Sequence, residues 1–224
     1  AVGNMYPAEI VSHHWNPIRG KCYYRDMCGY CYVPHTRAAR YYEGEPKLVD
    51  KELKTNLGKG NKIFVASMID MWHNKIPAGW IYGVLCHCDE YPENEYLFQS
   101  KNPGRFLEFA KEFPPHTMLA TTIEGTIDLD ISKEQYGRAC CLNRVKRIIK
   151  YKALLTIEPI HKSNIDWLVD DILTAKPDIV TIGADSKGHG LIEPTATEVM
   201  ELIDWLKKAG YKVILKENLK RIMG

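Results

Sequence analysis

The run Gly20-Lys-Cys-Tyr-Tyr-Arg-Asp-Met-Cys-Gly-Tyr-Cys-Tyr32 places three cysteines within ten residues, at Cys22, Cys28 and Cys31. No fourth cysteine lies near them in the sequence. A structural zinc site or a closed electron-transfer cluster normally uses four protein ligands. Three thiolates can instead hold three irons of a four-iron cluster and leave the fourth iron open. The spacing therefore predicts a cluster that binds a further ligand and does chemistry on it.

Composition limits the classes of function. The chain has 224 residues, 26% of them charged, and a formal net charge of +2, so it lacks the polybasic character that a nucleic acid or an acidic membrane would demand. Its longest apolar runs are about six residues, far below the roughly 20 needed to span a bilayer. Residues 1–5 lack the features of a secretory signal, and seven cysteines without such a signal predict a reducing compartment. A disulfide framework would leave an odd cysteine. We expect a cytoplasmic protein with no membrane partner.

Seven short apolar runs alternate with helix-like segments along the chain. They are residues 9–13, 62–67, 96–100, 117–122, 153–157, 178–182 and 212–215. Each run is almost continuously hydrophobic, which is typical of parallel strands buried on both faces. The alternation predicts repeated βα units in one domain over residues 1–224, with residues 1–8 left aside as a tag remnant or a flexible segment.

Apolar residues between these runs have helical spacing. Val199, Leu202, Ile203 and Leu206 share one helix face, and Gly210 follows as a stop signal. Two further faces are predicted over residues 142–149 and 106–113. A helix over residues 167–173 has Ser163 or Asn164 as candidate caps and ends before Pro177.

Polar residues follow all seven predicted strands. These strand ends are residues 13–16, 67–70, 99–101, 121–124, 158–159, 183–185 and 216–218. Polar groups at seven successive carboxyl ends converge only if the strands curl around one mouth. We therefore predict an α/β fold, a parallel (β/α)6–7 partial TIM barrel, in preference to a doubly wound open sheet.

The cysteine loop directly follows the first predicted strand and carries the aromatic Tyr30 just before its last cysteine. In both respects it resembles the cluster loop of the radical S-adenosylmethionine superfamily, although the spacing is CX5CX2C where CX3CX2C is usual. A wider pattern resembles a phage- and mobile-element-associated three-Cys-motif family that is distantly similar to spore photoproduct lyase. That pattern lies in residues 15–22, 28–32, 66–70, 99–103, 156–159 and 213–216, so the resemblance covers roughly residues 10 to 218.

The resemblance implies a [4Fe-4S] cluster on Cys22, Cys28 and Cys31, whose open iron chelates the amino and carboxylate groups of S-adenosyl-L-methionine. One electron then cleaves the sulfonium to methionine and a 5′-deoxyadenosyl radical, which abstracts hydrogen from a substrate. A reductase or a flavodoxin- or ferredoxin-type protein is the implied electron donor. The substrate stays open among a nucleic acid, a nucleotide, a peptide and a small metabolite.

The resemblance also suggests roles for strand-end residues. Tyr30 would pack on the adenine, and Asp70 would receive the methionine ammonium with help from Ser67, at the place where the superfamily commonly has Gly-Gly-Glu. Lys101 would neutralise the methionine carboxylate as a point charge. The ribose contacts would be Thr122 and Glu124, and the catalytic or substrate contacts Gln99, Glu158, Asp185 and Lys216. Away from a cluster, however, an Asp or Lys at a strand end is more often a cap or a solvated charge.

A second hypothesis is a non-catalytic zinc- or iron–sulfur-binding module that contacts nucleic acid. It draws on two basic groups, one of Lys146, Arg147, Lys150 and Lys152 and one of Lys216, Lys220 and Arg221. A basic stripe on a helix is usually a solvated face, and the net charge is small. A brown, oxygen-sensitive protein would favour the enzyme, and a colourless protein with one zinc would favour the module.

The remaining cysteines invite a second metal site at Cys86-His87-Cys88 and Cys140-Cys141. Positions i and i+2 on a helix do not share a face, so Cys86 and Cys88 would chelate poorly on one. Buried structural thiols are the commoner explanation.

Overall fold

A seven-stranded parallel sheet forms the centre of the protein. The computed structural model describes residues 5–125, 130–162 and 165–224. The strands are β1 His13–Trp15, β4 Lys62–Val65, β5 Glu95–Gln99, β6 Thr117–Ile123, β7 Lys152–Ile157, β8 Ile179–Ile182 and β9 Lys212–Leu215. Their order in the sheet is β1-β4-β5-β6-β7-β8-β9, with every neighbouring pair parallel. Because this order never reverses, the topology is that of a barrel and not of a doubly wound sheet.

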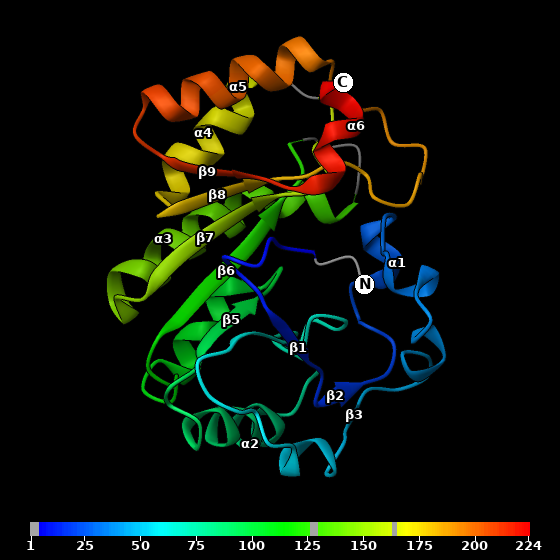
Figure 1. Ribbon diagram of the computed structural model, residues 1–224, viewed down its shortest axis with the longest axis vertical. Helices are drawn as coiled ribbons and strands as arrows, with labels where there is room; N and C mark the ends of the chain where they lie inside the picture. The colour runs from blue at the N-terminus through cyan, green and yellow to red at the C-terminus, as the bar shows by residue number, and fades with distance from the viewer. Residues whose placement is uncertain (1–4, 126–129, 163–164) are drawn as a thin grey trace.

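Helices cover the outside of this sheet. The α-helices are α1 Arg25–Cys28, α2 Ala78–Asp89, α3 Gln135–Ile149, α4 Ile165–Ala175, α5 Ala196–Lys208 and α6 Lys220–Met223. The 3-10 helices are η1 Val33–His35, η2 Ala39–Tyr41, η3 Glu52–Lys54, η4 Pro103–Phe109, η5 Asp130–Glu134 and η6 Glu217–Leu219. Figure 1 shows the sheet curling from β1 in the lower half to β9 near the top, with α4 and α5 above β9, α3 on the left and α1 on the right. The predicted partial barrel is confirmed.

Two elements differ from the sequence prediction. The first strand is displaced, because residues 7–11 form a turn in which the N–H groups of Ile10 and Val11 both donate to the carbonyl of Pro7, at 2.9 and 3.0 Å. The side chains of Ile10 and Val11 are nevertheless buried, because they pack against the sheet although they are not part of a strand. The helix expected over residues 106–113 is the 3-10 helix η4, which begins at Pro103. Within the described residues, no helix is long and apolar enough to cross a membrane.

The outer core has two parts. Trp72 lies against Phe106 and Phe109 with edge-to-face geometry, next to β4 and β5. The other part packs α3, α4 and α5 on β6, β7 and β8, and the predicted apolar face of α5 is buried in it. Thr195 and Glu198 form a capping box at the start of α5. The cap expected at Ser163 or Asn164 lies outside the described residues.

The N-terminal segment fills the inside of the curled sheet. Six strands each contribute one buried side chain to this inner core, namely Phe64, Leu97, Ala120, Leu154, Ile179 and Ile214. Tyr6, Ile10 and Val11 pack against them, and Tyr6 has no exposed surface. Tyr6 belongs to residues 1–8, which the sequence analysis left aside, and its burial gives Tyr6 itself a part in the inner core.

Candidate functional site

A small ribbon holds the cysteine loop at its two ends. Strand β2, Ile18–Arg19, pairs antiparallel with β3, Lys47–Leu48, just before and well after the cysteines. Gly20 follows β2 with a φ of +119°, and a Cβ there would lie 2.5 Å from the Cα of Pro46. Only glycine allows this conformation and this close approach of two chains. The path of the loop away from β1 therefore depends on Gly20.

Helix α1 arranges the three cysteines. Cys28 ends the helix, and Gly29 adopts a left-handed conformation that turns the chain back toward Tyr30 and Cys31. All three cysteines are free thiols; Cys28 is buried, and Cys22 and Cys31 are half-buried. Burial raises the pKa of Cys22 to about 12, with further contributions from Asp70 and from Cys28. The same effect raises the pKa of Cys28 to about 11, where Cys31 adds to it and Lys101 opposes it.

The three thiols could supply a four-iron cluster with one ligand for each of three irons. In the described part of the chain, no three His, Cys, Asp or Glu side chains come together closely enough to hold one metal ion. The thiols instead influence one another electrostatically in a half-buried loop, with the Lys101 cation next to Cys28 to offset thiolate charge. Deprotonation of these thiols would accompany metal binding.

Tyrosines fasten the loop over the carboxyl ends of the strands. The hydroxyl of Tyr32 donates to the carbonyl of Ser67, after β4, at 2.6 Å, and that of Tyr30 donates to Glu124, after β6, at 2.5 Å. Lys101, after β5, places its Nζ 5.3 Å from the centre of the Tyr30 ring. The chain leaves β4 through Ala66 at a φ of 54°, a conformation that costs about 1–2 kcal/mol for a non-glycine residue. The structure thus brings the loop together with the predicted residues after β4, β5 and β6.

Asp70 serves the fold as well as this site. Its Oδ1 accepts from the backbone N–H of Trp72 at 3.0 Å and from the hydroxyl of Ser100 at 2.9 Å, and its Oδ2 accepts from the N–H of Lys101 at 2.7 Å. Burial raises the pKa of Asp70, although these hydrogen bonds oppose the change. The backbone of Asp70 is also hydrogen-bonded to Cys22. Asp70 therefore ties the ends of β4 and β5 to the first cysteine.

Glu124 is a positioning residue in this structure. It has no exposed surface, and its Oε2 accepts from Arg138 at 2.6 Å and from Ser132 at 3.0 Å, while Tyr30 occupies Oε1. Both carboxylate oxygens therefore already have partners within the protein. The ribose contact expected from the sequence stays a prediction. Arg138, on α3, was missed, and the sequence carries no signal for it because a helical arginine normally faces solvent. Thr122 is also buried and accepts from the side chain of Gln99 at 2.9 Å.

The remaining predicted residues are paired with one another farther round the sheet. Lys216 donates to Glu158 Oε2 at 2.5 Å, and Asn218 donates to Oε1 at 2.8 Å. A Cβ at Gly183 would lie 2.6 Å from the same carboxylate, so glycine leaves it room. The Nζ of Lys216 lies 3.8 Å from the ring centre of Tyr6. Glu158 and Lys216, expected as substrate contacts, thus neutralise each other.

Tyr6 links this pair to the centre of the sheet. Its hydroxyl donates to the side-chain carbonyl of Gln99 and shares a hydrogen bond of 2.5 Å with Thr156. Thr181 in turn donates to Thr156 at 3.1 Å. Sequence reasoning missed Tyr6, since it lies outside every motif and before the first strand.

Asp185, after β8, orients a histidine. Its Oδ1 lies 2.6 Å from Nδ1 of His189, and its Oδ2 accepts from the backbone N–H of that residue. The other ring nitrogen of His189, Nε2, is buried without a hydrogen-bond partner, and the ring of His35 lies edge-on at 5.3 Å. An imidazole held through Nδ1 with Nε2 free is suited to donate or accept a proton. Asp185 is one of the catalytic or substrate residues predicted from the sequence.

The other cysteines form no comparable site. Cys86 and Cys140 are exposed, Cys88 is buried and Cys141 is half-buried, and none belongs to a metal-binding group among the described residues. Burial raises the pKa of Cys88 well above that of an ordinary thiol, as expected for a structural side chain.

Comparison with known proteins supports the fold. Spore photoproduct lyase complexed with dinucleoside spore photoproduct has a TM-score of 0.57 at 10% identity, over 91% of this chain and 75% of that one. A mutant lyase with bound AdoMet and the same dinucleoside has a TM-score of 0.51 at 13% identity, over 87% and 61%. SuiB from Streptococcus suis bound to S-adenosylmethionine has a TM-score of 0.55 at 14% identity, over 91% and 49%.

The sequence comparisons are of a different kind. No curated protein matches the chain. The family model "Protein of unknown function (DUF5131)" matches residues 7–206, which is most of its length. The chain therefore belongs to the DUF5131 family.

Proposed function

We propose that this protein is a radical S-adenosylmethionine enzyme that holds a [4Fe-4S] cluster on Cys22, Cys28 and Cys31. The observation that carries the proposal is the three-thiol loop, which tyrosine hydrogen bonds fasten over the ends of β4 and β6. The proposal is supported by a fold similar to that of two solved structures bound to S-adenosylmethionine.

The bound cluster would supply one electron, received from a reductase or a flavodoxin- or ferredoxin-type donor, to split the sulfonium–C5′ bond of S-adenosylmethionine into methionine and a 5′-deoxyadenosyl radical. That radical would take a hydrogen atom from the substrate to give 5′-deoxyadenosine. The N-terminal segment contributes by closing the inside of the barrel, where Tyr6 is fully buried. A substrate would therefore approach the outer mouth, and water would be kept from the floor below it.

The residues around the loop have separate tasks in this proposal. Lys101 holds a cation beside Cys28 and Tyr30, where the methionine carboxylate would need a positive partner. Asp70 and Ser67 would receive the methionine ammonium, and Tyr30 would pack on the adenine. Glu124 and its ion pair position Tyr30. The substrate remains open among the classes given above. The hydrogen-bonded His189–Asp185 pair would handle a proton on it.

Cluster loading tests the proposal directly. Anaerobic reconstitution should give about four irons and four sulfides per chain, and the Cys28→Ala variant should lose them. Cys86→Ala is the matched control, because Cys86 is an exposed free thiol on α2. A full cluster in Cys28→Ala would contradict the assignment. Reduced protein should then form 5′-deoxyadenosine from S-adenosylmethionine, whereas a colourless protein with one zinc would favour the non-catalytic module.

Lys101 offers the cleaner test of cofactor binding. Asp70 bonds backbone groups of two loops, so its loss would disturb the fold as well. Lys101→Met should weaken S-adenosylmethionine binding by about 1.5–3 kcal/mol, the range for a hydrogen bond to a charged group. Lys75→Met is the control, because the Nζ of Lys75 lies 5.2 Å from the ring centre of Tyr23 in the same loop. Equal affinities in the two variants would refute the placement.

A further inference from the structure

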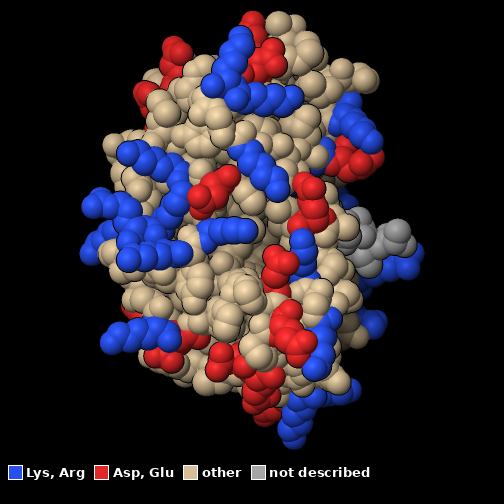
Figure 2. All heavy atoms as spheres, turned by 60° about the vertical axis from the view of Figure 1, so that its left-hand side comes forward, with Lys and Arg blue, Asp and Glu red and all other residues tan. Residues whose placement is uncertain are grey.

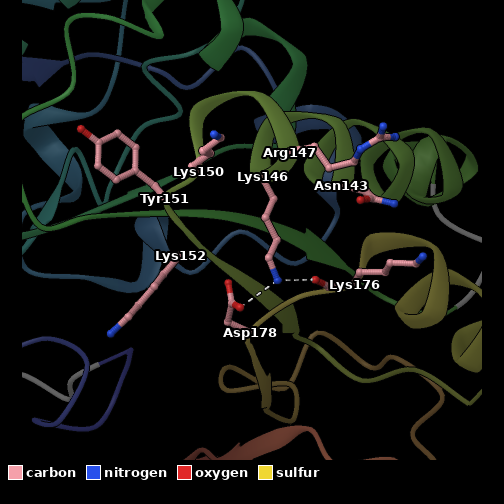
Figure 3. Close-up of a pocket in the computed structure, with 8 residues that line it drawn as sticks. All are labelled: Asn143, Lys146, Arg147, Lys150, Tyr151, Lys152, Lys176 and Asp178. Atoms are coloured by element: carbon pink, nitrogen blue, oxygen red, sulfur yellow. Dashed lines mark hydrogen bonds and ion pairs between the residues drawn. The ribbon is translucent and has the colours of Figure 1, made fainter.

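An open, basic pocket of about 680 Å³ lies at the end of the sheet opposite the cysteine loop (Figure 3). Its lining residues are Asn143, Lys146, Arg147, Lys150, Tyr151, Lys152, Lys176 and Asp178. Lys152 begins β7 and Asp178 precedes β8, so the pocket adjoins the amino ends of these strands. The strands are parallel, and the cysteine loop contacts their carboxyl ends, so the two sites are separate.

The pocket concentrates positive charge. Its lining has five cations and one carboxylate, a net charge of +4, whereas the whole chain carries only +2. The one carboxylate, that of Asp178, forms an ion pair with Lys146, whose Nζ donates to it at 2.7 Å. The same Nζ also donates to the backbone carbonyl of Lys176 at 2.9 Å. The face that carries α3 comes forward in Figure 2, where Lys and Arg crowd together at mid-height on the left with little acidic surface between them.

Four of the five cations form no ion pair within the described residues. Arg147, Lys150, Lys152 and Lys176 are exposed, and none has an ion-pair partner among the described residues. Favourable interaction with the carboxyl end of α3 accounts for a cation or two in its last turn, but not for all four. Lys150 and Lys176 also adopt left-handed conformations, with φ of 63° and 47°, at positions after α3 and α4 where glycine or asparagine is usual. The backbone conformation at these two positions therefore does not explain why lysine is found there.

The arrangement of these cations indicates the kind of ligand. In Figure 3 they stand around the pocket and point in different directions instead of converging on one point. Converging cations would hold one small anion, whereas cations spread around a hollow suit a ligand with charges at intervals along a chain. The planar guanidinium of Arg147 can also bind a phosphate through two hydrogen bonds.

We propose that this pocket binds the sugar–phosphate backbone of a nucleic acid strand. A phosphodiester chain is narrow enough to enter the hollow, whereas a flat layer of lipid headgroups would meet only the rim. The site goes beyond the proposed enzymatic function and needs neither the cluster nor S-adenosylmethionine. Its contacts would be to phosphates and therefore largely independent of sequence.

The salt dependence of binding tests the proposal. Fluorescence anisotropy with labelled DNA and RNA oligonucleotides should give a logarithmic slope of affinity against salt of about −3.6 for duplex DNA and −2.8 for single strands, if the four free cations each contact a phosphate. For duplex DNA this equals a loss of roughly 150-fold in affinity between about 50 and 200 mM salt. Absence of binding at the lower salt concentration would overturn the proposal.

Two triple variants make the test specific. Neutralising Arg147, Lys150 and Lys152 to glutamine should reduce the duplex slope to about −0.9, because about one unit is lost per phosphate contact. The control neutralises Lys47, Lys51 and Lys54, which are also exposed and without ion-pair partners among the described residues, and should keep the full slope. Equal slopes in the two variants would overturn the proposal. So would polyglutamate or anionic vesicles that compete as well as the nucleic acid, since they would assign the pocket to an acidic protein or a membrane.

Discussion

Replacing Arg138 with methionine would leave a buried acidic cluster without its cation. Arg138 is 3% exposed and donates to Glu124, which has no exposed surface. Asp171 is also buried nearby, and Arg138 holds down its pKa against the stronger effect of burial. Methionine keeps much of the volume of arginine but none of its charge. Breaking a buried ion pair by removing one partner costs about 3–5 kcal/mol, so we expect a loss of that size in the free energy of unfolding.

Urea and thermal denaturation measure this loss. For a domain of this size, each kcal/mol shifts Tm by about 2–4 °C, so Arg138→Met should melt roughly 6–20 °C lower than the parent. Lys133→Met is the matched control, since it removes the exposed Lys133–Asp130 pair, whose side chains are 63% and 70% exposed. An exposed pair contributes about 0–1 kcal/mol. Equal losses in the two variants would refute the view that burial gives the Glu124–Arg138 pair its importance.

The pH dependence of the loss gives a second check. Without Arg138, burial of Asp171 is less opposed, so the pKa of this carboxyl should rise further and Asp171 should hold its proton more tightly in the folded protein than in the unfolded chain. The folded state of the variant then binds more protons, so its stability relative to the parent should fall as pH rises. We therefore expect a smaller difference in Tm at mildly acidic pH than at neutral pH. A difference that grows on acidification would contradict this reasoning.

Three further predictions concern other parts of the fold. Gly20→Ala should destabilise the protein or displace the cysteine loop, because the new Cβ would lie 2.5 Å from the Cα of Pro46. Gly79→Ala, in open space on α2, should instead stabilise the protein by about 0.5–1 kcal/mol. Equal urea midpoints for the two variants would contradict this. Burial raises the pKa of Asp171 from 3.8 to about 6, so ionisation of this carboxyl lowers the free energy of unfolding as pH rises from about 4 to 6. In urea titrations, the stability of Asp171→Asn relative to the parent should therefore increase over that interval. A difference that does not change with pH would contradict this. Thr195→Ala should lower the free energy of unfolding by about 1 kcal/mol, because it removes the capping box of α5. Thr36→Ala, which lies outside any α-helix, should lower it by less in the same urea titration.

The sequence by itself determined the barrel. The strand over residues 153–157 is almost continuously apolar and buried, and this property is local, because a strand buried on both faces needs mostly hydrophobic side chains. The exception is instructive. Residues 9–13 are apolar enough to predict a strand, yet Ile10 and Val11 lie in a turn and pack into the inner core from there. A side chain can be buried against the sheet without being part of one of its strands.

The sequence also determined the three thiols and their place after the first strand. Only the tertiary structure decided how the charged residues around them are used. Glu124 and Arg138 are 14 residues apart, and Glu158 and Lys216 are 58 apart, and nothing local relates the members of either pair. A buried charge needs a partner of opposite sign, and folding chooses that partner from whichever side chains it brings near. Tyr6 likewise gains its role only because the curled sheet leaves an interior that the N-terminal segment fills.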